Sequence, residues 1–327
     1  MKYMEIGKSK IKVPRITLGA MGMGGGAQWQ SDDSVALKTI DTALDIGINY
    51  IDTAPVYGMG HSEELLGKAL KGRRERVILS TKCSLQWRNR EGVFEYERDG
   101  LYVYRNLSKK SIKNDLEVSL KRLRTDYIDI FITHRQSDVY PVEETMEALL
   151  EMKKEGKIRA IGISNSNPDH LEDYLKYGQV DLVQDKYSIL DRKLGAEYLP
   201  SCEKNGVTFQ AFSMLERGLL TGKIGMDYLV KPDEARNVVE WFEPSKRILV
   251  LQMLEGWANL CEKYNCSMTN LVTACSLAES MNFSALVGVR RPESIIDAVK
   301  AMDIELDVED FEKMKSDADV VVAASHI

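Results

Sequence analysis

Four side chains able to move a proton stand at the ends of short apolar runs. Asp52 and Tyr57 follow the run at 49–51, Lys82 ends the run at 77–82, and His134 ends the run at 128–134. A phenol with a pKa of ~10 is a weak acid at neutral pH, and a neighbouring ammonium group stabilises its phenolate. When hydride reaches a carbonyl carbon, negative charge develops on the oxygen and a proton must meet it. The set therefore predicts reduction of a carbonyl group with general acid catalysis.

Each of the four residues has a role in this hypothesis. Tyr57 would donate the proton, Lys82 would support it, Asp52 would hold Lys82, and His134 would orient the carbonyl oxygen by a hydrogen bond. Each also has a structural explanation when taken alone. Asp52 could cap a loop, and Tyr57 could be a buried ring. Lys82 could pair with a nearby acid, and His134 could be a structural histidine. Their joint placement at successive strand ends favours the functional interpretation.

Apolar runs of strand length alternate with amphipathic segments of helix length along the chain. Such alternation predicts parallel strands joined by right-handed crossovers, and eight units fit a closed (β/α)8 TIM barrel. An open doubly wound sheet is the second possibility, but its glycine fingerprint after the first strand is missing. The expected strands are 16–20, 50–54, 77–83, 128–134, 158–163, 180–187, 207–213 and 284–289.

Further segments complete a single domain over residues 1–327. Residues 3–13 alternate around a turn and predict an N-terminal hairpin, and the glycines at 22–26 predict a flexible loop at a pocket mouth. We expect an aromatic loop at 84–107 and an irregular segment at 214–243. Extra helices are expected near the C-terminus, at 245–264, 267–281, 292–302 and 308–317.

Bulk properties restrict the possible partners and location. The net charge of −6 disfavours nucleic acid and anionic membranes as partners. No apolar run approaches the ~20 residues of a membrane span, and the first residues lack an apolar signal core. Five cysteines without a C-x-x-C pair predict reduced thiols and no metal site. These features predict a cytoplasmic protein.

More polar residues stand where other predicted strands end. They are Ser164 and Asn165 after the fifth strand, Gln184 in the sixth, Ser213 after the seventh and Arg290 after the eighth. Active sites of TIM barrels lie at the carboxyl ends of the strands. Core packing does not explain polar residues at nearly every strand end, so we expect one site there.

Several segments resemble the aldo-keto reductase family along nearly the whole chain. They are Asn49–Ala54 with Tyr57-Gly58, Leu120–Leu123 with Thr125–Asp129, Gly156–Asn165 and Gly218–Lys223. Within the family the chain is most similar to a bacterial branch with an NADH-specific member, through Tyr104–Ser108, Lys186–Arg192 and Val239–Phe242.

The resemblance implies roles for particular residues. The family's catalytic tetrad falls on Asp52, Tyr57, Lys82 and His134. Its ligands to the nicotinamide amide fall on Ser164, Asn165 and Gln184, and Tyr187 would stack near the nicotinamide ring. Ser213, Leu215 and Gly218 lie where the family's loop after the seventh strand wraps the pyrophosphate.

The chain departs from the family at the far end of the cofactor site. Gly288 and Ser294 replace the usual lysine and arginine, and Asp297 stands where glutamate is common. Two cationic contacts to a 2′-phosphate are thereby lost, and one such charge-assisted bond contributes roughly 1.5–3 kcal/mol. Arg290 and Arg291 could compensate or could form a solvated pair. The pattern favours NADH as cofactor, and NADPH stays open.

The substrate and two rival functions stay open. Trp29, Trp87 and Tyr57 predict a pocket for a small aldehyde, ketone or sugar. Arg135, beside His134, could attract an anionic substrate or point into solvent. Lys186 lies on the same strand face as Gln184 and would serve a Schiff-base lyase on the same barrel. A non-catalytic nicotinamide-binding regulator is the other alternative, although it would not need the complete tetrad.

Overall fold

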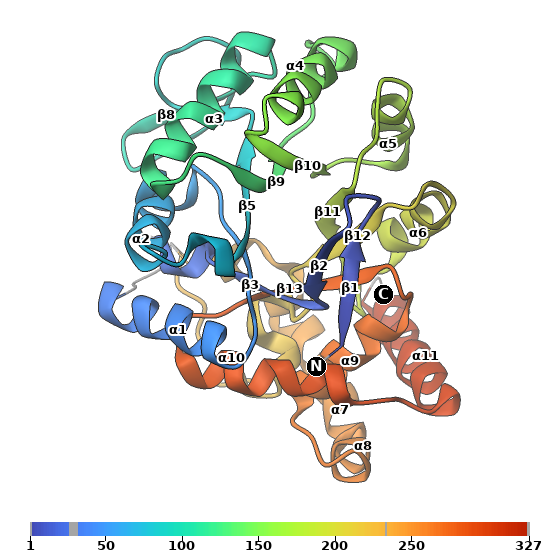
Figure 1. Ribbon diagram of the computed structural model, residues 1–327. Helices are drawn as coiled ribbons and strands as arrows, with labels where there is room; N and C mark the ends of the chain where they lie inside the picture. The colour runs from blue at the N-terminus through green and yellow to red at the C-terminus, as the bar shows by residue number, and fades with distance from the viewer. Residues whose placement is uncertain (1, 26–31, 233, 326–327) are drawn as a thin grey trace.

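Eight parallel strands form a closed barrel in the computed structural model, which describes residues 2–25, 32–232 and 234–325. The barrel order is β10-β11-β12-β13-β3-β4-β5-β9 (Figure 1). Because β3 pairs with both β4 and β13, the sheet is closed, which confirms the TIM barrel and excludes the open sheet. The strands are β3 (Ile16–Gly19), β4 (Tyr50–Asp52), β5 (Ile78–Cys83), β9 (Ile128–Thr133), β10 (Ile158–Ser164), β11 (Leu182–Lys186), β12 (Thr208–Phe212) and β13 (Phe283–Gly288).

Helices surround the barrel and cover the outward face of its strands (Figure 1). They are α1 (Asp33–Asp45), α2 (His61–Ala69), α3 (Lys109–Leu123), α4 (Val142–Lys154), α5 (Pro168–Leu175), α6 (Lys193–Asn205), α9 (Met268–Ala278) and α10 (Pro292–Ala298). Each buries an apolar stripe at helical spacing, such as Ile40, Ala43 and Leu44 in α1. Several of these helices begin after a polar capping residue. Ser108, for example, precedes α3, and its side chain accepts a hydrogen bond from the Ser111 amide in the first turn.

The hairpin of β1 (Tyr3–Ile6) and β2 (Ile11–Pro14) was predicted from its alternation, and the structure places it across the amino-terminal end of the barrel. Ile6, Ile11 and Val13 are buried against the inward residues Tyr50 and Ile130 of the strands. The opposite, carboxyl end of the barrel is therefore the end that stays available for a site.

A second core lies beside the barrel. It joins α7 (Pro244–Gly256), α8 (Ala258–Lys263) and α11 (Val308–Ala324) to α9 and to the segment after β12. That segment forms short 3-10 turns: η4 (Glu216–Thr221), η5 (Ala235–Val238) and η6 (Glu240–Phe242). The predicted irregular segment is thus anchored by burial of residues such as Leu219 and Trp241.

Some expected boundaries were wrong. Residues 84–107 are not a loop but contain a three-stranded antiparallel sheet of β6 (Leu85–Gln86), β7 (Val93–Arg98) and β8 (Leu101–Arg105). The helix expected at 245–264 divides at Trp257, and the one at 292–302 ends in the 3-10 turn η7 (Val299–Asp303). The last helix continues to Ala324. In the glycine loop, Gly22 lies in the turn η1 (Met21–Met23), whereas Gly26 and Trp29 lie outside the described residues.

None of the helices that the structure describes is long and apolar enough to cross a membrane.

Candidate active site

A buried ion pair forms the base of the site at the carboxyl ends of β4 and β5. Lys82 Nζ donates to Asp52 Oδ1 at 2.7 Å and to the Thr53 carbonyl oxygen at 2.8 Å. Both charged side chains are only 1% exposed. Such a pair is stable in the interior only if its remaining hydrogen-bonding capacity is filled. Asp52 Oδ2 meets this condition, because it accepts from Ser80 Oγ at 2.7 Å and from Gln184 Nε2 at 2.9 Å.

Tyr57 and His134 lie directly above this pair. Lys82 Nζ is 5.2 Å from the centroid of the Tyr57 ring, and the His134 ring stands edge-on to Tyr57 with 6.0 Å between centroids. The structure therefore brings together the four residues whose spacing predicted a tetrad.

The turn that presents Tyr57 depends on two glycines. Gly58 has a φ of 59°, and a Cβ built there would lie 1.8 Å from the Gly24 carbonyl oxygen. A Cβ on Gly24 would lie 2.8 Å from the Tyr57 carbonyl carbon. The loop after β3 can therefore approach the Tyr57 turn closely only because both positions lack a side chain.

Electrostatics keep the phenol neutral and the ammonium charged. Burial raises the pKa of the Tyr57 phenol above its usual value, although Lys82 opposes this change. Burial alone would lower the pKa of Lys82, but Asp52 and Tyr57 raise it above its usual value. The expected lowering of the Tyr57 pKa by Lys82 thus exists as one contribution, which burial outweighs.

His134 is uncharged in this environment. Burial, followed by the charges of Lys82 and Arg135, lowers the pKa of its imidazole well below the usual value. Its Nδ1 atom is buried without a hydrogen-bond partner among the residues that the structure describes. Its carbonyl oxygen accepts from Asn165 Nδ2 at 2.9 Å, which fixes the residue at the end of β9. A neutral imidazole can donate one hydrogen bond to a substrate oxygen without adding charge.

Three polar residues beside the tetrad fit the amide of a nicotinamide. Ser164 ends β10 and Asn165 follows it, and Ser164 Oγ accepts from Asn165 Nδ2 at 3.1 Å. Gln184 on β11 uses its Nε2 for Asp52 and for Gln210 Oε1, at 2.9 and 2.7 Å. Its carbonyl oxygen Oε1 is thereby oriented as the acceptor for an amide N–H.

Tyr187 is not brought to this group. It packs against Phe283 with 5.0 Å between ring centroids, and its hydroxyl donates to Glu279 Oε1 at 2.6 Å. It lies in the outer core between strands and helices, so the structure does not support the expected stacking role. Side chains alternate between the two faces of a strand. Because Gln184 points into the barrel, residue 187, three positions further on, points away from it.

The segment after β12 has an unusual backbone that sequence reasoning missed. Ser213, Glu216 and Arg217 have left-handed φ values of 61°, 43° and 51°. Such strain persists only where the surroundings enforce it. Here the buried Glu216 accepts from Ser188 Oγ at 2.5 Å, and Arg236 Nε donates to the Arg217 carbonyl oxygen at 2.9 Å. No sequence motif indicated Glu216 or Arg236.

The other two residues expected at the pyrophosphate belong to the same segment. Leu215 packs partly buried against the second core, and Gly218 adopts a φ of 99° in η4. The segment is therefore held at the barrel mouth with its backbone curved, as a phosphate-wrapping loop would need.

The predicted far end of the cofactor site combines open space with arginines. Gly288 ends β13 exposed, and a Cβ there would meet no atom of the described residues within 4 Å. The Arg290 side chain lies against Gly22, and burial together with Arg236 and Arg291 lowers the pKa of its guanidinium. Ser294 is exposed on α10. Asp297 instead faces α9, where it accepts from Ser267 Oγ at 3.1 Å and Asn270 Nδ2 at 3.2 Å.

Lys186 is held in a salt bridge. Its Nζ lies 2.9 Å from Asp191 Oδ2 and 4.0 Å from Glu216 Oε1. Burial alone would lower the pKa of Lys186, but Glu216 and Asp191 raise it above the usual value. A Schiff-base lysine must be an uncharged amine, so this environment argues against the lyase.

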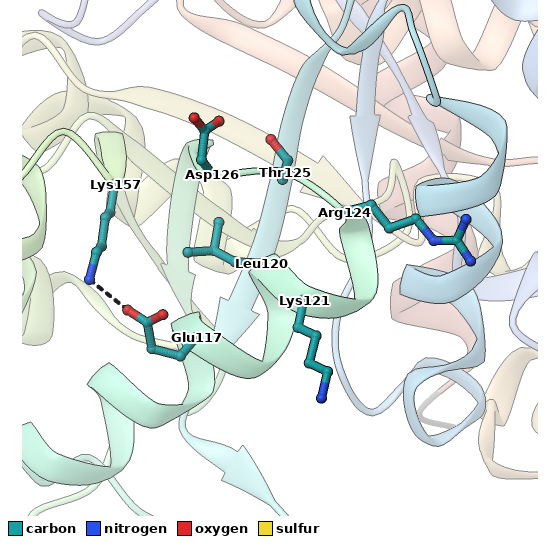
Figure 2. Close-up of a pocket in the computed structure, with 7 residues that line it drawn as sticks. All are labelled: Glu117, Leu120, Lys121, Arg124, Thr125, Asp126 and Lys157. Atoms are coloured by element: carbon teal, nitrogen blue, oxygen red, sulfur yellow. Dashed lines mark hydrogen bonds and ion pairs between the residues drawn. The ribbon is translucent and has the colours of Figure 1, made fainter.

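A separate hollow lies at the other end of the barrel, where β9 and β10 begin. Figure 2 shows that it is lined by Glu117, Leu120, Lys121, Arg124, Thr125, Asp126 and Lys157. An ion pair of 2.6 Å between Lys157 Nζ and Glu117 Oε1 crosses it. It shares no residue with the tetrad.

Comparisons with known proteins agree with this geometry. A model of the Aldo/keto reductase family matches residues 15–318. The NADH-specific methylglyoxal reductase of Escherichia coli (strain K12) is 42% identical over 327 residues, covering 98% of this chain and 99% of that protein. Aldo-keto reductase YhdN of Bacillus subtilis (strain 168) is 35% identical and covers 89% and 86%. The predicted resemblance, including its branch, is confirmed.

Solved structures give the same result. Glycerol dehydrogenase AKR11B4 from Gluconobacter oxydans superimposes with a TM-score of 0.87 at 29% identity, covering 98% of this chain and 95% of that one. The holo form of aldo-keto reductase AKR11C1 from Bacillus halodurans gives a TM-score of 0.78 at 28% identity, covering 97% and 96%.

Proposed function

The chain belongs to the aldo-keto reductase family, and we propose that it reduces a small aldehyde, ketone or sugar carbonyl to an alcohol with Tyr57 as the general acid. It is an NAD(P)H-dependent oxidoreductase. The observation that supports the proposal most strongly is the 2.7 Å pair of Lys82 with Asp52 lying beneath Tyr57 and beside His134.

Each residue of the tetrad has a defined task in the proposed reaction. A nicotinamide cofactor, when bound, would be the source of the hydride for the carbonyl carbon. The Tyr57 hydroxyl donates its proton to the carbonyl oxygen, and the Lys82 ammonium stabilises the phenolate that remains. Asp52 accepts from Lys82 and keeps it charged and in position, and Ser80 and Gln184 hold Asp52 by donating to it. The neutral His134 donates a hydrogen bond that orients the carbonyl oxygen.

The cofactor site supports a preference for NADH. Gly288 and Ser294 offer no charge to a 2′-phosphate, and the similar protein from Escherichia coli is NADH-specific. Arg290 and Arg291 are the residues that could still recognise NADPH. Ser164, Asn165 and Gln184 would bind the nicotinamide amide, and Ser213, Leu215 and Gly218 would lie along the pyrophosphate. A location in the cytoplasm is part of the same proposal.

Two measurements test the proposal. Intrinsic fluorescence first monitors a titration of the protein with NADH and with NADPH. Turnover is then measured with a panel of small carbonyl compounds. We expect tighter binding of NADH and oxidation of NADH when a carbonyl compound is added. Tighter binding of NADPH would show that Arg290 or Arg291 replaces the lost contacts. Cofactor binding without turnover on any carbonyl would favour the regulator, and binding of neither cofactor would refute the proposal.

A further inference from the structure

We propose that Arg135 selects carbonyl substrates that carry a carboxylate, so that the enzyme prefers oxo acids and aldehyde acids to uncharged carbonyl compounds. This inference rests on the proposed function, because it assigns a substrate class to the same site. It concerns a residue that follows His134 directly and has no part in the tetrad.

The backbone of Arg135 is fixed beside the reacting groups. Its amide donates to Ser84 Oγ at 3.1 Å, and its carbonyl oxygen accepts from the same hydroxyl at 3.2 Å. Ser84 follows β5 and is itself held, since its amide donates to Asp115 Oδ2 at 2.9 Å. The Arg135 side chain therefore starts from a rigid position at the carboxyl ends of β5 and β9.

The guanidinium of Arg135 retains its capacity to bind an anion. Its side chain is 45% exposed, and its Nε forms an ion pair with Glu95 Oε1 at 3.6 Å, a separation too long for a hydrogen bond. Among the residues that the structure describes, we find no hydrogen bond donated by its side-chain nitrogens. Five N–H donors in a planar fork suit a carboxylate, which they can bind through two parallel hydrogen bonds.

Two carboxylates lie near Arg135, and each of them has other partners. Glu95 is shared with Arg105, whose Nε lies 3.5 Å from Oε2 and whose Nη1 donates to the Gln136 carbonyl oxygen at 2.7 Å. Two guanidinium groups thus face one carboxylate. Asp185 also lies near enough to interact with Arg135 electrostatically, but its Oδ2 already accepts from the amide and hydroxyl of Ser166.

The reacting groups add no net negative charge that would compete with a substrate anion for Arg135. The pair of Lys82 and Asp52 is neutral as a whole, and His134 is uncharged. The positive charge of Arg135 is felt at His134, where it helps to lower the pKa of the imidazole. A substrate anion beside Arg135 would therefore be attracted to within reach of the proton donor.

The apolar wall between Tyr57 and the sheet of β6, β7 and β8 suits the remainder of such a substrate. Tyr57, Met59, Trp87 and Tyr96 pack on a buried apolar cluster of Ala54, Val56, Leu85 and Val103. The positive charge of Arg135 acts on the Tyr96 phenol and opposes the rise of its pKa that burial causes, so the arginine lies close to this apolar wall. A short apolar or aromatic body with a carbonyl at one end and a carboxylate at the other fits both.

Steady-state kinetics with two matched aldehydes test this inference. The substrates are 4-carboxybenzaldehyde and methyl 4-formylbenzoate, measured with NADH on the wild type, Arg135→Gln and Arg90→Gln. Arg90 is the control because its exposed guanidinium lies 5.3 Å from the Tyr102 ring and its loss changes the net charge equally. For the wild type we expect a kcat/KM roughly tenfold or more higher with the acid, 4-carboxybenzaldehyde, than with its methyl ester, as one charge-assisted hydrogen bond would give.

The variants should separate this role from a structural one. Arg135→Gln should abolish the preference for the acid mainly by raising its KM, whereas Arg90→Gln should retain it. Equal kcat/KM values for acid and ester in the wild type, or a preference that survives in Arg135→Gln, would overturn the inference and leave the proposed function intact. Turnover of neither aldehyde, nor of any other carbonyl compound, would instead refute the proposed function.

Discussion

Asp52 accepts hydrogen bonds from Lys82, Ser80 and Gln184 while it is almost completely buried. Asp52→Asn would leave the Lys82 ammonium in the interior without a carboxylate. Removing one partner of a buried ion pair typically costs about 3–5 kcal/mol. We expect a loss of this size in the free energy of unfolding, measured with urea, together with a loss of turnover.

Ser80→Ala is the matched control for that experiment. It removes one neutral donor to Asp52 and retains the ion pair, so it should cost only about 0.5–1.5 kcal/mol. An Asp52→Asn variant as stable as Ser80→Ala would contradict the account of the pair.

His134 links stability to pH. Its imidazole has an ordinary pKa of about 6.5 when unfolded, and burial holds the folded value well below that. Below pH ~6.5 the unfolded chain therefore binds a proton that the folded chain does not, so this stability is present above pH ~6.5 and is lost as the pH falls. Between pH 7.5 and 5.5 the wild type should lose about 1.4 kcal/mol more than His134→Gln.

Urea unfolding of both proteins at several pH values measures this difference. Above pH 8 the offset between the two proteins should be constant, which serves as the internal control. Parallel stability curves down to pH 5.5 would show that His134 takes up a proton equally in both states.

At the residue scale, the tetrad could be predicted because its members stand at strand ends, which a closed barrel brings to one face. The structure brings Asp52, Tyr57, Lys82 and His134 together as expected. Tyr187 is not brought to this group, because strand alternation turns it outward into the core, and its expected contact with the nicotinamide stays a prediction. Arg236 could not be predicted, since its contact with Arg217 joins residues of an irregular segment.

Among the elements, α2 and α3 approach each other closely at Gly67. A Cβ there would lie 2.3 Å from the Arg122 carbonyl oxygen and 3.0 Å from the Leu123 carbonyl carbon. Backbone atoms cannot move aside cheaply, so Gly67→Ala should destabilise the protein by about 1–3 kcal/mol. Urea or thermal unfolding measures the change.

Gly256 provides a control at which alanine should not destabilise the protein. It is exposed in α7, and an added Cβ would meet nothing within 4 Å. Gly256→Ala should be neutral or stabilise by up to about 1 kcal/mol, because alanine favours the helix. Equal effects of the two substitutions would mean that the α2–α3 contact is looser than the structure indicates.

At the element scale, all eight barrel strands could be predicted from apolar runs, because each is buried on both faces. The hairpin of β7 and β8 was missed although its signal was present. Asp99 and Gly100 have left-handed φ values of 52° and 74°. They form an Asp-Gly turn between two runs in which apolar and polar residues alternate. The break at Trp257 had no comparable signal, since helical periodicity continues across it.

In the molecule as a whole, early and late parts of the chain close the barrel. Arg15, just before β3, donates to the carbonyl oxygens of Leu277 and Ser280, both at 2.6 Å, and to that of Phe283. We therefore expect the whole chain to unfold as one cooperative unit. Tryptophan fluorescence, to which the buried Trp241 and Trp257 contribute, and far-ultraviolet circular dichroism should give coincident urea transitions. Two separated transitions would contradict a single domain.

The central claim is that Tyr57 donates the proton while Lys82 and Asp52 support it, and Tyr57→Phe tests it most directly. Rapid mixing of the NADH-loaded variant with an aldehyde measures the reduction step, and a fluorescence titration measures NADH affinity. We predict a loss of about 10²–10⁴-fold in the rate of reduction with NADH affinity unchanged, and wild-type rates in the exposed control Tyr102→Phe. A Tyr57→Phe variant that reduces the aldehyde at more than about a tenth of the wild-type rate would contradict the account.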